Sequence, residues 1–477
     1  MAAAMEAPSR WHIRGAFAFL IGAVVVATVA GGPLSWDGAY LLFKSLDLQS
    51  PCLPHGRYSL VVLEVPVVLA SRLTDNLRVL ELVFGLVYAM IPLVALWGSW
   101  RVVKSKAPQL VIWPFLGVCL GSLCGQFFFV SECLIALHLT WPLLLVAITG
   151  RWAKAWPWAL ALVVFLFFLH PVVTGLLVLV SLTSVLRGLR RPEQRWDGWV
   201  AAGVLLVIAA ARGLLSARLA YEADSAAELL AIVQRVGPPP LAYWAALLAG
   251  AAVCSGAIAG RERGHWERAS FLLLSVAAVA FLVWASAPAN WRDELNYRFV
   301  APLCALPFYA FAIGDGLVWP AASSASGRSW LMLLSAGVFT LVLSVQSLLW
   351  WQLRGALLQA VNGAESCIAL DSLDFARRSA LSWWSTAPYS ILLQGRSLRN
   401  LVLTEGGCRA DDIQSVIRMY PLGPRPRVGG GTWFDLARAG LGDPAALPAA
   451  AALVPPTPGR LAPRLGSPEV AASPERR

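Results

Sequence analysis

The fold follows from the stretch Gly15-Ala16-Phe17-Ala18-Phe19-Leu20-Ile21-Gly22-Ala23-Val24-Val25-Val26-Ala27-Thr28-Val29-Ala30-Gly31-Gly32, an uncharged run that leads into Ser35-Trp36-Asp37-Gly38-Ala39-Tyr40. A membrane-crossing helix needs roughly 20 residues for about 30 Å of hydrocarbon, which this run provides. Arg10 and Arg14 precede it as in a signal peptide, but no small-residue cleavage site introduces a soluble domain. We therefore predict a retained first span, with Asp37 just outside the bilayer.

Composition extends this interpretation to most of the chain. Of the 477 residues, 58% are hydrophobic and 14% are charged, and the mean hydropathy is +0.65. These values are typical of an integral membrane protein and exclude a soluble globular one. The net charge of +11 would suggest nucleic acid in a soluble protein. Here the basic residues lie largely in short connections between apolar runs, so we expect no nucleic-acid partner.

The chain contains about eleven apolar segments of a length suited to membrane spans. The predicted spans are 15–32, 77–97, 109–127, 130–149, 155–169, 172–186, 199–215, 241–259, 271–286, 299–317 and 330–349. The pair 155–169 and 172–186 is separated only by His170-Pro171. Because proline removes a backbone donor, it can either kink one long helix or separate two.

Basic residues alternate with these spans, which predicts the orientation. By the positive-inside rule they face the cytoplasm. They are Arg10, Arg14, Arg101, Lys104, Lys106, Arg151, Lys154, Arg187, Arg190, Arg191, Arg195, Arg261, Arg263, Arg268 and Arg328. We therefore expect a multi-pass protein of a bacterial-type inner (plasma) membrane, with a cytoplasmic N-terminus and an extracytoplasmic C-terminus.

Three domains are expected. Residues 1–350 form the membrane module, whose first outer loop (33–76) holds interfacial amphipathic helices at 38–47 and 58–73. Residues 351–441 form a small extracytoplasmic α/β domain, with strands at 366–371 and 400–404 and helices at 380–393 and 411–419. The tail 442–477 is rich in Pro, Ala and Arg and is expected to be disordered.

Cysteine usage fits this placement. Five cysteines lie in apolar spans, where a thiol behaves as a small hydrophobic group: Cys119, Cys124, Cys133, Cys254 and Cys304. Cys367 and Cys408 alone fall in the outer domain, and we predict a disulfide between them in an oxidising periplasm. No Cys/His cluster has zinc-site spacing, so no metal site is expected.

Asp37 is the strongest catalytic candidate. A carboxylate tethered at the membrane face can accept the proton of an acceptor hydroxyl as a general base. The alternative is that Asp37 only starts a helix, since Asp is a good N-cap. Across the same loop, Arg57 offers a planar fork of donors suited to phosphate, and His55 can add a second contact. Arg57 could instead reach toward lipid headgroups.

Other polar residues lie in the predicted outer segments. Glu132 begins the fourth span, where an unpaired acid is expensive, and His170 lies at an outer turn, as a ligand or as a structural group. Arg298 follows Tyr297 at the outer lip of the tenth span, placed to meet an anionic group. The neighbouring Arg292, Asp293 and Glu294 can form a local salt-bridge network.

The arrangement resembles the GT-C superfamily of membrane glycosyltransferases, which use polyprenyl-phosphate sugars. Ser35-Trp36-Asp37-Gly38-Ala39-Tyr40 is similar to the family's first-loop aspartate motif, and Asn296-Tyr297-Arg298-Phe299-Val300-Ala301-Pro302-Leu303 to a late Arg-Tyr-Leu-Leu-Pro type segment. The resemblance implies an all-α polytopic fold of about eleven helices, with a small C-terminal α/β periplasmic domain. The chain departs from the family's pattern in two ways. It has no clear paired acid beside Asp37, and it has no long acidic motif in a later loop.

If the resemblance holds, Asp37 is the base, and Arg57, Arg298 and His55 bind the donor phosphate. The residues expected to contact substrate are Tyr40, Tyr58, Glu132, His170 and Tyr297. No cofactor is required, although a divalent cation is possible, and the chain has no nucleotide-binding motif. The expected partners are a polyprenyl-phosphate-linked sugar, membrane lipid, and a carbohydrate, lipid or protein acceptor.

Two alternatives remain open at the level of sequence. The number of spans also fits a transporter or lipid flippase, although such proteins tend to show internal repeats and mid-membrane charges. A non-catalytic membrane assembly factor, whose outer domain binds a partner, is the third possibility.

Overall fold

The structure is a computed structural model. It describes residues 10–35, 37–121, 130–191, 193, 195–219, 221–223, 296–318, 325–362, 367–369, 388–390, 392–393 and 401–403. The predicted spans 241–259 and 271–286 lie outside these residues, as do most of the predicted outer domain and all of the tail 442–477.

In the described part of the chain, six helical segments are long and apolar enough to cross a membrane. They are α1 (Arg10–Ala30), α4 (Leu77–Ala89) continued by α5 (Ile91–Val103), α7 (Glu132–Thr149), α9 (Val173–Arg190), α10 (Arg195–Arg218) and α16 (Ala325–Val361). The chain is thus a multi-pass membrane protein.

Shorter apolar helices occupy three more of the predicted spans. The 3₁₀ turn η3 (Pro108–Val111) leads into α6 (Ile112–Cys119), and α8 (Trp152–Phe167) precedes α9. The helix α15 (Asn296–Ile313) continues into a π-helical turn, η6 (Gly314–Val318). At His170-Pro171 the structure has two helices, because α8 ends at Phe167 and α9 begins at Val173. The proline therefore separates two helices and does not kink one.

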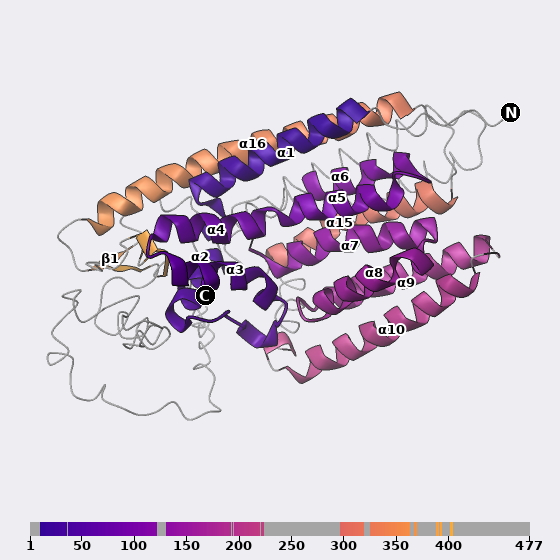
Figure 1. The fold of residues 1–477 in the computed structure, drawn as a ribbon, viewed down its shortest axis with the longest axis horizontal. Helices are drawn as coiled ribbons and strands as arrows, with labels where there is room; N and C mark the ends of the chain where they lie inside the picture. The colour runs from indigo at the N-terminus through magenta and orange to yellow at the C-terminus, as the bar shows by residue number, and fades with distance from the viewer. Residues whose placement is uncertain are drawn as a thin grey trace, which may run out of the picture.

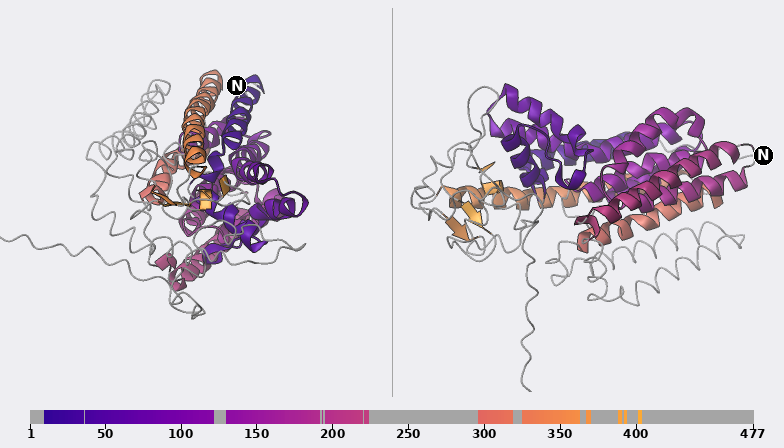
Figure 2. Two further views of the ribbon diagram at one scale, coloured as in Figure 1. Left: turned by 90° about the vertical axis from the view of Figure 1, so that its left-hand side faces the viewer. Right: turned by 90° about the horizontal axis from the view of Figure 1, so that it is seen from below.

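The helices run roughly alongside one another, with α1 and α16 side by side in every view (Figures 1 and 2). Among the described spans, α7 is the most enclosed. It packs against α5, α9 and α15, and 94% of the residues in its apolar stretch are buried. For α10 the corresponding share is 28%, as expected for a helix on the lipid-facing rim. Polar groups at either end of α7 therefore lie near the axis of the bundle, surrounded by the other helices.

The predicted basic connections that belong to the described residues share one end of the bundle. Arg151 donates to the Val102 carbonyl and, at 2.6 Å, to the Ser105 hydroxyl, which joins the start of α8 to the end of α5. Arg190, at the end of α9, donates to the carbonyl of Leu317 at 2.6 Å. This clustering agrees with the expected sidedness, while the cytoplasmic orientation stays a prediction.

The first loop folds back on the opposite end as two short helices, α2 (Asp37–Leu48) and α3 (Leu60–Leu73), which lie beneath α4 (Figure 1). The predicted helices at 38–47 and 58–73 are confirmed. The chain leaves α1 at Gly31, whose φ of 83° is in the left-handed region that favours glycine. A 3₁₀ turn, η1 (Gly32–Leu34), then delivers Asp37 to the first turn of α2. A second 3₁₀ turn, η2 (Pro54–Gly56), precedes α3.

Two short strands follow the membrane module. The strands β1 (Cys367–Ala369) and β2 (Leu401–Leu403) pair in parallel, with Cys367 opposite Leu401. Both fall within the segments predicted as strands, 366–371 and 400–404. The α/β character and the boundaries of the surrounding domain stay predictions.

Gly38 provides a test of how closely α2 packs against the turn that precedes it. A Cβ at this position would lie 1.8 Å from the carbonyl oxygen of Pro33 and 3.2 Å from Val130. We predict that Gly38→Ala lowers the free energy of unfolding by about 2 kcal/mol or more, because backbone must shift. Gly22→Ala is the matched control, since nothing lies within 4 Å of a Cβ there. Equal thermal stability of the two variants in detergent would contradict this packing.

Candidate functional site

The first loop is attached to the ends of helices that are distant in sequence. It contacts them through four side chains: Arg57 pairs with Glu132, Ser59 donates to the carbonyl of Phe165, Tyr58 packs edge-on against Phe168 at 5.6 Å, and His55 stacks on Tyr221 at 3.5 Å between ring centroids. The loop thereby covers the ends of α7 and α8 and the segment after α10. Nearly all the predicted site residues lie at this end.

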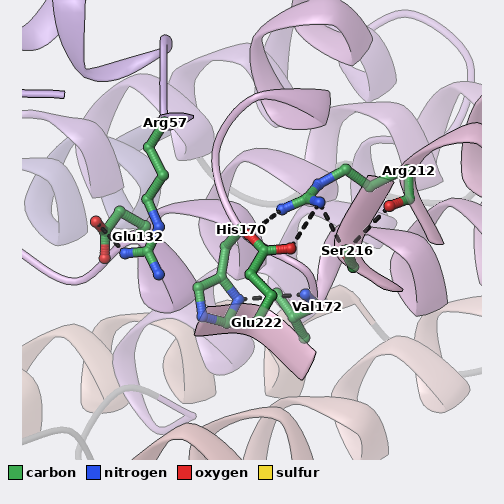
Figure 3. A network of polar contacts seen from close by, with 7 residues as sticks. All are labelled: Arg57, Glu132, His170, Val172, Arg212, Ser216 and Glu222. Carbon is green, nitrogen blue, oxygen red and sulfur yellow. Dashed lines mark hydrogen bonds and ion pairs between the residues drawn. The ribbon is translucent and has the colours of Figure 1, made fainter. Parts of the chain in front are cut away.

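The ion pair of Arg57 with Glu132 is the central contact (Figure 3). Both side chains are only 6% exposed. Glu132 is the first residue of α7, after Ser131 whose hydroxyl accepts from the Leu134 amide. The alternative that Arg57 reaches toward lipid headgroups is therefore wrong. Glu132, at a position where an unpaired acid would be expensive, is held by this cation.

A second buried ion pair lies beside the first (Figure 3). Arg212, near the end of α10, binds Glu222 through both terminal nitrogens, at 2.9 and 2.8 Å, and also donates to Ser216. Burial opposes ionisation of Glu222, but hydrogen bonds from Arg212 and Ser216 outweigh it and lower its pKa. The positive charge of Arg57 lowers this pKa further, so the two pairs form one alternating row of charges.

Glu64 in α3 is the acid at this end, among the described residues, whose pKa is most strongly shifted. It is fully buried, and its Oε2 accepts from the Ser45 hydroxyl at 2.6 Å and from the Cys52 amide. A hydrogen bond with the Tyr88 side chain also favours the ionised carboxylate. Burial raises the pKa of Glu64 to about 8, with a smaller contribution from the charge of Glu132. At neutral pH this carboxyl is therefore mostly protonated and can donate a hydrogen bond.

Asp37, Tyr40 and Cys52 surround the same point. Burial, followed by the charges of Cys52 and Asp37, raises the pKa of Tyr40 well above its ordinary value. Burial and the charge of Glu64 raise the pKa of Cys52 to about 12, and nearby Lys44 opposes this. Asp37 is half-buried and belongs to the first turn of α2, where the helix dipole stabilises a negative charge. The helix-starting role and a role in chemistry are therefore compatible.

The remaining predicted site residues lie outside the acid cluster. His55 and Tyr58 are exposed on the loop surface, and the Nδ1 of His170 accepts from the Val172 amide at 3.2 Å, a structural role at the start of α9. Tyr297 and Arg298 lie in the first turn of α15, but their side chains are outside the described part. Since α15 continues to η6 at the basic end, its first turn lies toward the loop end. Cys367 lies in β1 and Cys408 outside the described residues, so the disulfide stays a prediction.

Sequence inspection missed several residues of this site. Glu64 is the single charge in the apolar stretch Leu60-Val61-Val62-Leu63-Glu64-Val65-Pro66-Val67-Val68-Leu69-Ala70. Arg212 is likewise the single charge in the predicted span 199–215. A lone charge in an apolar segment is a usable signal, because it requires a buried partner. Nothing in the sequence indicates which partner it has.

The cluster has the composition of an acid–base site. Among the described residues, no group of three His, Cys, Asp or Glu side chains is placed to hold a metal ion. The site combines one carboxyl that is neutral near pH 7, Glu64, with a second carboxyl, Asp37, in a more open position. Acids in contrasting environments can take different proton-transfer roles.

Comparisons of the chain with protein families, with curated proteins and with solved structures gave no match. A function must therefore be argued from the residues and the geometry described above.

The raised pKa of Glu64 predicts a pH-dependent stability. Between its ordinary pKa of 4.5 and about 8, Glu64 holds a proton in the folded protein but not in the unfolded chain. The free energy of unfolding should therefore fall as pH rises through this window, by up to about 1.4 kcal/mol per pH unit. Thermal unfolding between pH 5 and 8 measures the slope.

The variant Glu64→Gln should remove most of this slope, because its side chain does not titrate. Glu222→Gln is the control: it lowers stability at every pH in this range but keeps the slope, since the pKa of Glu222 is lowered. The assignment is wrong if wild type and Glu64→Gln have the same pH dependence.

Proposed function

We propose that this chain is an integral membrane glycosyltransferase that transfers a sugar from a polyprenyl-phosphate donor to an acceptor on the extracytoplasmic side. The observation that carries the proposal is the convergence at one end of the bundle. Asp37 and Glu64 come from the two short helices of the first loop, and the buried Arg57–Glu132 pair fixes that loop to the central span. The resemblance to the GT-C superfamily adds support, on the two sequence stretches that carry it.

The separation of charges between the two ends supports an outward-facing site. The basic connections gather at the end opposite to this cluster. If the positive-inside rule holds, that end is cytoplasmic and the acid cluster faces the extracytoplasmic side. A lipid-linked donor would then have its chain among the spans and its phosphate at the outer interface.

In the proposed reaction, Asp37 acts as the general base. It removes the proton of an acceptor hydroxyl as the oxygen attacks the anomeric carbon, forming the new glycosidic bond. The bond from that carbon to the phosphate oxygen breaks, and the electron pair leaves with the polyprenyl phosphate. Arg298 is the proposed cation that stabilises this developing charge, because the predicted phosphate ligand Arg57 is instead balanced by Glu132 in a buried ion pair. No nucleotide or cofactor takes part in the step.

Glu64 has a different role in this proposal. Because its pKa is about 8, it is mostly neutral at pH 7. A neutral carboxyl can donate a hydrogen bond to a sugar oxygen without adding negative charge near the phosphate. Tyr40, which lies within range of the same charges, is the proposed neighbouring contact. The acceptor in this scheme is a carbohydrate, a lipid or a protein hydroxyl.

The variant Asp37→Asn tests the base. Membranes containing wild type or variant protein receive a panel of radiolabelled hexoses and pentoses linked to short-chain polyprenyl phosphate. We expect Asp37→Asn to lose at least about a hundredfold in transfer rate, the usual contribution of a general base. Asp75→Asn is the matched control, since Asp75 is an exposed acid after α3 in the same loop. The proposal fails if no donor supports transfer, or if Asp37→Asn transfers sugar as fast as Asp75→Asn.

A further inference from the structure

A group of exposed cations lies at the basic end of the bundle, across the ends of α1, α5 and α8. Arg14 belongs to α1, and Arg101 and Lys104 lie at the end of α5. Lys106 lies in the connection that follows, and Lys154 in the first turn of α8. All five side chains are exposed. These five residues are called the basic surface below.

The neighbouring Arg151 has a structural role and holds two parts of this surface together. It donates to the carbonyl of Val102 and, at 2.6 Å, to the hydroxyl of Ser105. These bonds fasten the start of α8 to the connection after α5, so Lys154 is held beside the two lysines of that connection. Like charges held near one another repel, and a bound anion relieves this repulsion.

The basic surface contains no internal counter-charge. None of its five residues forms an ion pair among the described residues. The stretches 10–14, 97–111 and 150–158, which carry these cations, contain no Asp or Glu. By contrast, Arg57, Arg212 and Arg354 each pair with a carboxylate elsewhere in the described chain. The cations of the basic surface are therefore available to an anionic ligand.

Two of these arginines are held over tryptophan rings. The guanidinium carbon of Arg14 lies 5.9 Å from the ring centroid of Trp11, and that of Arg101 lies 5.5 Å from the ring centroid of Trp97. Trp11 is 78% exposed and Trp97 is 57% exposed. A cation–π contact positions a guanidinium and leaves its N–H groups able to donate. Tryptophan favours the membrane interface, which indicates that both pairs face lipid.

The two arginines lie at about the same depth in the bilayer. Helix α1 runs alongside α4 and α5 in the opposite direction (Figure 1). The register is given by Gly85, where a Cβ would lie 3.3 Å from Thr28. Arg14 precedes Thr28 by 14 residues and Arg101 follows Gly85 by 16. At 1.5 Å per residue these are distances of about 21 and 24 Å, so the depths differ by only about 3 Å.

This depth corresponds to the level of the lipid headgroups. The segments 15–32 and 82–100 contain no charged residue over 18 and 19 residues. Such segments are about 27–29 Å long as helices, close to the thickness of the hydrocarbon layer. Arg14 and Arg101 are the first charges beyond these segments at the basic end. Their guanidinium groups therefore lie where the phosphates of that leaflet lie.

We propose that the basic surface binds the headgroups of anionic phospholipids in the leaflet at this end of the bundle, with Arg14 and Arg101 contacting the phosphodiester. The planar fork of a guanidinium matches two phosphate oxygens, and the lysines add attraction to anionic lipid. A lipid is the occupant because the cations are placed by lipid-facing tryptophans at headgroup depth. The inference depends neither on the proposed transfer reaction nor on which side of the membrane this end faces.

The test uses purified full-length protein in micelles of a non-ionic detergent. Thermal unfolding is measured with dioleoyl phosphatidylglycerol, with zwitterionic dioleoyl phosphatidylcholine, and with glycerophosphoglycerol, which is the anionic headgroup without acyl chains. A ligand that binds only the folded state raises the melting temperature. Phosphatidylglycerol should raise it for wild type, and the other two should not at the same concentration. High salt should weaken the effect, because the cations are exposed.

A charge-neutralised variant identifies the surface. The double variant Arg14→Gln with Arg101→Gln should weaken the apparent Kd for phosphatidylglycerol by about tenfold or more. Its matched control is Arg72→Gln with Arg218→Gln, which removes the same charge from exposed arginines at the opposite end of the bundle. The control should bind phosphatidylglycerol like wild type.

A second variant keeps the test independent of the helical arginines. Lys104→Gln with Lys154→Gln changes only exposed side chains near the connections and should also weaken binding. The proposal is overturned if phosphatidylcholine stabilises wild type as much as phosphatidylglycerol, or if the headgroup without acyl chains does so, which would indicate a site for soluble anions. It is also overturned if both charge-neutralised variants bind phosphatidylglycerol as tightly as the Arg72 and Arg218 control.

Discussion

The buried ion pair between Arg57 and Glu132 is the constraint on which the arrangement of the loop end depends. Glu132 begins the most enclosed helix of the bundle, where a charge without a partner would cost several kcal/mol. The cation that balances it comes from a loop seventy-five residues earlier in the chain. Because both side chains are desolvated, the loop has one position relative to α7, and α2 and α3 follow it. The acid cluster of Asp37 and Glu64 is the consequence.

The helix α4 connects this cluster to a second group of charges, in which Glu81 pairs with Arg78 and Arg354. Glu81 and Tyr88 are seven residues apart, which places them on the same face of the helix, two turns from each other. Tyr88 lies within range of the charges of Glu64 and Asp37, while Glu81 holds Arg354.

Sequence alone predicted the parts of the structure that depend on local pattern. The apolar runs predicted the spans, and the amphipathic pattern after Asp37 predicted α2 and α3. Both signals depend only on residues that are close together in the chain. Two outcomes were not accessible in this way: that Glu132 has a cation as its partner, and that Arg57 does not reach toward lipid headgroups. Both depend on a contact between residues far apart in the chain. Glu64, Arg212 and Arg354 were missed for the same reason, since a lone charge does not name its partner.

The most direct test of this account is a double-mutant cycle on the central pair, with Arg57→Gln, Glu132→Gln and the double variant. Each single variant leaves a buried charge without its partner and should be strongly destabilised, by about 3 kcal/mol. The double variant should be less destabilised than the sum, with a coupling energy of about 2 kcal/mol or more. A coupling energy below about 0.5 kcal/mol, as found for exposed pairs, would contradict the claim that this contact fixes the loop.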